Sequence, residues 1–159
     1  MTNLATFQRE LASLLRGEAA ASDEDYFREV ERSVGLDVAR YSVASWRQLL
    51  LRQATPLTIA ALTLGGRLEE AFRGLAIRAT SAYVEKLACE FLDDVTPSGD
   101  TLLRAVAQFE KAMIQGADET IEWPCEPYSA IAALLRGEEP EEDGRKHVVI
   151  VSGGRFRVA

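Results

Sequence analysis

The chain has 159 residues, a formal net charge of −7 and an ordinary globular composition, with 47% hydrophobic and 27% charged residues. Its length fits one domain, and it lacks the run of about 18 apolar residues that a membrane-spanning helix needs. The first apolar segment contains Glu10 and has no basic start, so it does not look like a signal peptide, and we expect a cytoplasmic protein.

Apolar periodicity, capping residues and helix breakers predict a helical domain over residues 1–137, with a bundle of six or seven helices. The expected helices cover about residues 3–16, 22–34, 37–53, 56–64, 67–94, 101–115 and 128–136. The fourth of them is apolar nearly all round, so we expect it to be the buried central element.

Two of these helices carry specific expectations about burial. In the third, Ala39, Val43 and Trp46 recur at helical spacing and predict one inward-facing stripe. The fifth is expected to run without interruption, with Ala79 and Tyr83 in its apolar stripe.

An acidic linker at residues 138–146 precedes a predicted C-terminal β-hairpin at residues 147–159. Two β-rich runs flank Gly153-Gly154, a combination that favours a two-residue turn. That turn pairs Val151 with Phe156 and Val149 with Val158, and makes an apolar face that docks on or near the helical body. The predicted fold is therefore mainly α with a small hairpin.

Side chains that could carry catalysis are scarce. His147 is the only histidine, which excludes a histidine-cluster metal site and disfavours a Ser-His or Cys-His mechanism. Cys89 and Cys125 lack the spacing of a metal or redox motif and are expected to be free thiols. We therefore expect no cofactor, no metal and no enzymatic activity.

The hairpin and the segment from Trp123 to Tyr128 are the candidate binding surfaces. A hairpin edge has unpaired backbone groups that an extended peptide can use, so proline at Val149 or Ile150 is expected to abolish binding. The alternatives are that the hairpin only caps the core and that the segment only seals one end of it. Residues 120–127 are expected to be irregular or briefly extended, because two prolines interrupt them. The candidate peptide-binding residues are Val148, Ile150, Arg155, Arg157, Trp123 and Tyr128.

Arginines concentrate in the middle of the chain. Residues 40–78 hold six arginines against Glu69 and Glu70, a local balance of +4. One interpretation is a solvated helix face paired with the acidic flanks. The other is a DNA-binding module, with Arg40, Arg47 and Arg52 as its candidate residues, although the overall charge argues against a nucleic-acid partner.

Residues 36–140 also carry a pattern of motifs. A Tyr/Arg-bearing helix leads to a Pro-x-Thr turn, an apolar helix ending in Leu-Gly, and then Phe-x-x-Leu-Ala. The matching positions are Arg40, Tyr41, Pro56, Thr58, Leu64, Gly65, Phe72, Leu75 and Ala76, followed by AQFEKAM at 107–113 and PYSAIAALLRGE at 127–138. The pattern resembles small bacterial helical proteins labelled as DNA-binding domains. Proteins of that family are encoded beside multinuclear non-haem iron oxidases in peptide natural-product pathways.

This resemblance implies an accessory protein and not an enzyme. Proteins of that family are thought to bind the leader of a ribosomally made precursor peptide and to present its core to the oxidase, which holds the iron. The implied partners are therefore an iron-dependent oxidase, in a heterodimer, and a precursor peptide.

Overall fold

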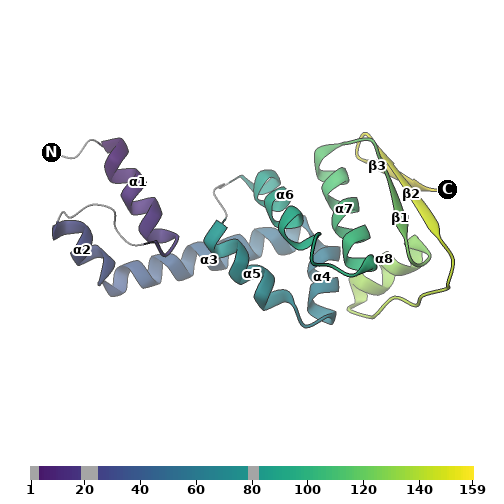
Figure 1. Cartoon of the computed structure of the whole chain (residues 1–159), viewed down its shortest axis with the longest axis horizontal. Helices are drawn as coiled ribbons and strands as arrows, with labels where there is room; N and C mark the ends of the chain where they lie inside the picture. The colour runs from purple at the N-terminus through teal and green to yellow at the C-terminus, as the bar shows by residue number, and fades with distance from the viewer. Residues whose placement is uncertain (1–3, 19–24, 79–82) are drawn as a thin grey trace.

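The computed structural model describes residues 4–18, 25–78 and 83–159 (Figure 1). The mainly α fold with a small C-terminal antiparallel sheet is confirmed. Within these ranges there are eight helices, where six or seven were predicted, and none is long and apolar enough to cross a lipid bilayer. The elements are α1 (Leu4–Leu15), α2 (Asp25–Glu31), α3 (Val34–Ala54), α4 (Pro56–Leu64), α5 (Leu68–Arg78), α6 (Val84–Val95), α7 (Thr101–Gln115), β1 (Glu119–Trp123), α8 (Pro127–Arg136), β2 (His147–Ser152) and β3 (Arg155–Val158).

Local capping explains several helix boundaries. The Ser33 hydroxyl accepts a hydrogen bond from the N–H of Leu36 at the start of α3, and the Asp100 carboxylate accepts one from the N–H of Leu103 at the start of α7. Gly116 ends α7 in the left-handed conformation, which glycine adopts without steric cost. These boundaries follow from nearby residues.

The predicted long helix over residues 67–94 is wrong, because the structure divides it into α5 and α6. Tyr83, which was expected in the buried stripe, precedes α6 with an extended backbone (φ −83°, ψ 130°) and is exposed. Extended angles are incompatible with a continuous α-helix. Ala79 and the predicted starts of the first two helices lie outside the described residues.

Three groups of buried side chains form the core. The first, around Leu51, Phe72 and Phe91, joins α3 to α4, α5, α6 and α7. The second, around Val106 and Trp123, joins α4, α7 and α8 to the sheet. Helix α7 contributes to both groups and so connects the two halves of the body.

The third group is separate and small. It consists of Leu14, Phe27 and Leu36, from α1, α2 and the start of α3. Figure 1 shows α1 and α2 at the far end of α3 from the sheet, where they form an arm. Trp46 of α3 was expected to face inward, but it is 60% exposed. The predicted inward stripe is wrong at this residue because the described parts of the chain leave most of its side chain uncovered.

The sheet has the order β1-β2-β3 and is antiparallel throughout. The predicted pairing of Val151 with Phe156 and of Val149 with Val158 is confirmed. Strand β1 is an addition, since residues 120–127 were expected to be irregular or briefly extended. The sheet thus joins residues on both sides of the acidic segment 138–146.

The tight turn between β2 and β3 gives a first prediction. Gly153 and Gly154 both have positive φ, 53° and 73°, as a type I′ turn requires. Gly154→Ala is expected to lower the free energy of unfolding by about 1 kcal/mol, because a Cβ is disfavoured in this conformation. Urea denaturation measures the change.

Gly35→Ala is the matched control for this turn. Gly35 lies inside α3, and a Cβ there would meet only the Ser33 hydroxyl at 3.8 Å. Alanine should therefore raise stability by about 0.5 to 1 kcal/mol through helix propensity. An equal loss of unfolding free energy in Gly154→Ala and Gly35→Ala would contradict the type I′ turn.

Candidate peptide-docking site

The backbone pairing decides which strand has a free edge. Strand β2 pairs with β1 on one side and with β3 on the other. Val149 and Ile150 therefore lie in a central strand, and proline at either position would disrupt the sheet itself. The predicted proline test on β2 is thus unsuitable, and the candidate edges are those of β1 and β3.

The free groups on β3 follow from the alternation of an antiparallel ladder. The N–H of Ala159 donates to the Val148 carbonyl at 2.9 Å, so every second residue from there, Arg157 and Arg155, also faces β2. The N–H and C=O groups of Phe156 and Val158 consequently point away from β2. No strand among the described residues pairs with that side.

The two edges of the sheet differ in charge. Arg155 and Arg157 are exposed on β3, whereas Glu119 and Glu122 are exposed on β1. Lys146 forms an ion pair with Glu122 at 3.5 Å. The edge of β3 is therefore basic and that of β1 is acidic.

Val148 and Ile150, two further candidate residues, lie half-buried on the outer face of the sheet. Ile150 is opposite Thr120 on one side and Arg157 on the other, while Val148 is opposite Glu122. This face places two aliphatic side chains next to the basic edge.

The two aromatic candidates have different environments. Trp123 is 1% exposed and packs edge-to-face against Phe109 at 5.7 Å, so its side chain belongs to the core and not to a binding surface. Tyr128 is 56% exposed, and its ring lies 5.7 Å from that of Phe156 in β3. Only Tyr128 can contact a ligand beside β3.

Helix α8 adds an exposed apolar residue to this region. Leu135 is exposed, and its separation of seven residues from Tyr128 places both on one side of the helix. Glu126 caps α8 by accepting hydrogen bonds from the N–H groups of Tyr128 and Ser129. The candidate site is thus the free edge of β3 with Arg155, Arg157 and Tyr128.

The three arginines of the nucleic-acid alternative do not form one free cluster. Arg40 donates to the Leu14 carbonyl at 2.7 Å, and the Arg52 guanidinium lies 5.4 Å from the centre of the Phe72 ring. Arg47 lines a groove of about 310 Å³ between α1 and α3, together with Arg40. Two of the three side chains therefore stabilise the fold.

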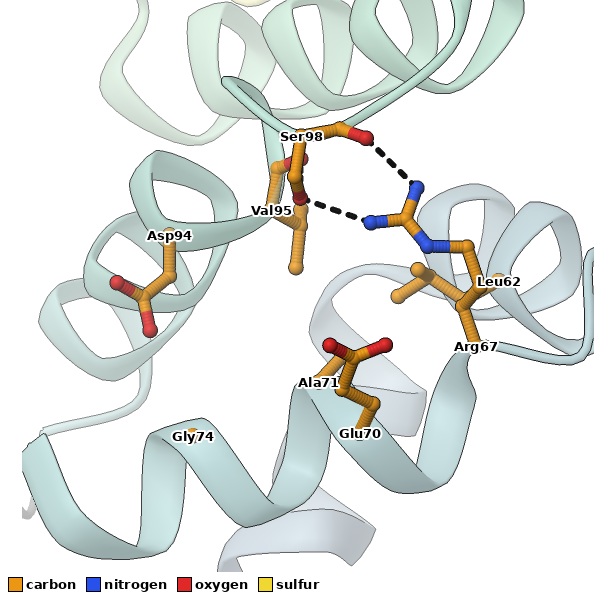
Figure 2. Close-up of a pocket in the computed structure, with 8 residues that line it drawn as sticks. All are labelled: Leu62, Arg67, Glu70, Ala71, Gly74, Asp94, Val95 and Ser98. Carbon is orange, nitrogen blue, oxygen red and sulfur yellow. Dashed lines mark hydrogen bonds between the residues drawn. The ribbon is translucent and has the colours of Figure 1, made fainter.

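A small pocket lies between the α4–α5 connection, α5 and the end of α6 (Figure 2). Arg67 crosses it and donates to the carbonyl and the hydroxyl of Ser98, both at 2.8 Å. Glu70 and Asp94 also line the pocket, whose volume is about 100 Å³. This volume is below the roughly 300 Å³ of a small-molecule site, and the contacts of Arg67 join two loops.

The side chains that the sequence analysis considered for catalysis are one histidine and two cysteines. The ring of His147 lies 2.7 Å from a carboxylate oxygen of Asp143. Cys89 and Cys125 are free, and burial raises the pKa of both thiols, which disfavours the nucleophilic thiolate. Across residues 4–18, 25–78 and 83–159, no three metal-liganding side chains cluster.

Glu110 is a residue that the sequence analysis did not single out. Its carboxylate lies in the core, 6% exposed, and accepts hydrogen bonds from the N–H groups of Leu57 (2.8 Å) and Thr58 (2.9 Å). These are the first N–H groups of α4, so α7 caps α4 across 53 residues of sequence. Burial raises the pKa of Glu110 to about 7, and the hydrogen bonds from Thr58 and Leu57 oppose the shift only partly.

Helix α4 receives no side-chain cap from its own neighbourhood. Thr55 precedes Pro56 in the position of an N-cap, yet its hydroxyl donates to the Leu51 carbonyl and caps nothing. The N–H groups of α4 therefore needed another acceptor, which a lone glutamate in the apolar pattern of α7 supplies.

Comparisons with family models, with curated proteins and with solved structures found no match to this chain.

Proposed function

We propose that this protein is a non-catalytic cytoplasmic partner that binds an acidic precursor peptide and forms a complex with an iron-dependent oxidase. The observation that carries the proposed peptide binding is the free edge of β3, where Phe156 and Val158 alternate with Arg155 and Arg157 and direct unpaired backbone groups outward. An extended peptide adds to such an edge through main-chain hydrogen bonds.

Charge and aromatic surface give this edge its selectivity. Arg155 and Arg157 attract carboxylates, and arginine binds them with two parallel hydrogen bonds. Tyr128 adds an exposed ring beside Phe156, against which an apolar peptide side chain can pack. We therefore expect a ligand in which acidic residues alternate with apolar ones.

The oxidase half of the proposal rests on the resemblance of residues 36–140 to accessory proteins of such oxidases. In that arrangement the oxidase supplies the iron and the redox chemistry, while this chain supplies peptide recognition.

Proline substitution at the edge tests the peptide half. Val158→Pro removes an N–H that points away from β2, and proline is tolerated on edge strands. Peptides selected from a display library of random dodecapeptides provide the ligand. We expect Val158→Pro to weaken binding at least tenfold, because a main-chain hydrogen bond is lost and the ring obstructs the edge. Fluorescence anisotropy measures the affinity.

Two control variants isolate the edge of β3. Val158→Ala keeps the N–H and should bind like wild type, which separates the backbone group from the partly buried side chain. Thr120→Pro removes an outward N–H from the acidic edge of β1 and should also leave binding unchanged. If Thr120→Pro lost peptide binding while Val158→Pro kept it, the peptide would bind at the edge of β1, and the proposal would be contradicted.

Capture from the native host tests the oxidase half. The tagged protein should co-purify with an iron-containing protein, measured by metal analysis of the eluate. A metal-free eluate would contradict the oxidase partnership, and a DNA fragment whose retention falls steeply with salt would support the alternative function.

A further inference from the structure

Helix α3 exposes an unusual amount of apolar surface. Five large side chains, each between 47% and 78% exposed, make up what we call the α3 face. They are Val34, Val38, Tyr41, Trp46 and Leu49. In Figure 1, α3 extends from the body toward α1 and α2, away from β3.

The five residues share one side of the helix. Successive residues of an α-helix are about 100° apart around its axis. The five side chains therefore fall within a sector of about 140°, with Tyr41 at one border and Trp46 at the other. Ser42 and Ser45 lie in the same sector, and both are exposed. From Val34 to Leu49 the sector contains no charged residue.

The order of these residues is suited to antiparallel pairing with an identical helix. If two copies cross near Val43, the small Ser42 of one copy lies opposite Ser45 of the other, and Val38 lies opposite Leu49. Small residues at the crossing allow close approach, while the large ones fill the space on either side. The sequence of the face is thus complementary to itself.

The charges at the two ends of α3 favour the same direction. Asp37 lies at the N-terminal end beside the face, and Arg52 lies at its C-terminal end. Antiparallel pairing brings the acidic end of one helix near the basic end of the other, whereas parallel pairing brings like charges together.

The exposed area is sufficient for a specific dimer. Five side chains of these sizes and exposures present on the order of 600 Å² per copy, so two copies bury roughly 1,200 Å². This equals the lower bound of a standard protein–protein interface and reaches the upper range of patches found on monomers.

We infer that the α3 face binds a second copy of this chain in an antiparallel, two-fold symmetric dimer. This inference is independent of the proposed peptide function, because it uses different residues at the other end of the body. The contact is isologous, so it closes with two copies and does not extend into a filament.

Sedimentation of the full chain tests the dimer. The wild type, of 17.5 kDa, should sediment as two copies at about 100 μM and dissociate on dilution. Val38→Glu should weaken the association at least tenfold, since it places a carboxylate against the apolar Leu49 of the other copy. The emission of Trp46, which is exposed in the monomer, should shift to shorter wavelength as the wild type associates.

Val84→Glu is the matched control, because Val84 is an exposed valine at the start of α6 outside the α3 face. It should associate like the wild type, and circular dichroism should show that both variants keep their helices. A wild type that remains a single copy at about 100 μM, or a Val38→Glu variant that dimerises with wild-type affinity, would overturn the inference. A wild type that stays a single copy would indicate that the α3 face contacts a different protein.

Discussion

Glu110→Gln is expected to abolish most of the pH dependence that one buried carboxyl gives to the stability of this protein. In the wild type the pKa of Glu110 is about 7 when folded and has its ordinary value of 4.5 when unfolded. The folded state therefore binds the proton more tightly. The resulting stabilisation is complete below pH 4.5 and is lost as the pH rises through 7.

The size of this effect follows from the difference between the two pKa values. It corresponds to a loss of about 3 kcal/mol of unfolding free energy between pH 4.5 and neutral pH. Urea denaturation at several pH values measures it as the difference between the wild type and Glu110→Gln, in which the contributions of other groups cancel. The difference should fall steadily as the pH rises.

Glu126→Gln is the control for a carboxylate that also caps a helix. Glu126 accepts from the N–H groups of Ser129 and Tyr128 but is exposed, and the hydrogen bonds from Ser129 lower its pKa. The stabilising effect of Glu126 is present above its unfolded pKa. The difference in unfolding free energy between Glu126→Gln and the wild type should therefore stay constant between about pH 5 and pH 8. A pH-independent difference for Glu110→Gln would contradict the buried position of its carboxyl group.

The helices of the body other than α5 and α6, which were predicted as one helix, were predictable because their signals are local. Pro56 at the first turn of α4, Asp100 as the cap of α7 and Gly137 after α8 each act within a few residues. The register of β2 with β3 was predictable for the same reason, since the turn fixes it.

The remaining features concern residues whose environment depends on distant parts of the chain. The segment that holds β1 was expected to be irregular or briefly extended, but its pairing with β2, about 30 residues further on, could not be predicted from the segment itself. Periodicity shows that Trp46 lies on an apolar stripe, but it cannot show whether anything covers that stripe. Glu110 caps a helix that is remote in sequence, and no local pattern specifies such a contact.

The candidate site was only partly predictable for a related reason. The basic residues Arg155 and Arg157 could be placed on the outer face of a hairpin from the alternation of side chains. Which strand edge stays unpaired depends on β1, however, because β1 occupies one side of β2 and leaves β3 as the basic edge. Because β1 pairs with β2, the proposed peptide contact is with β3 and not with β2.

Trp123→Ala is expected to destabilise the whole body, by about 3 to 5 kcal/mol. Trp123 is fully buried and contacts Phe109, whose ring also packs on Phe156 at 5.0 Å. Its loss leaves a cavity between α7 and the sheet. Because α7 belongs to both large core groups, the loss should lower hydrogen-exchange protection in α6 as well as in the sheet.

Phe27→Ala should behave differently, although Phe27 is also fully buried. Among the residues that the structure describes, its core group has only Leu14, Phe27 and Leu36 as buried members, and of the three helices that supply them only α3 also contributes to a large core group. We expect the amides of α1 and α2 to lose protection while those of α6 and α7 keep theirs, as measured by hydrogen exchange with mass spectrometry. Equal loss of protection across the chain in both variants would show that the arm and the body unfold as one unit. The contrast between the two variants follows from the position of α7, which couples the body internally but does not reach the arm.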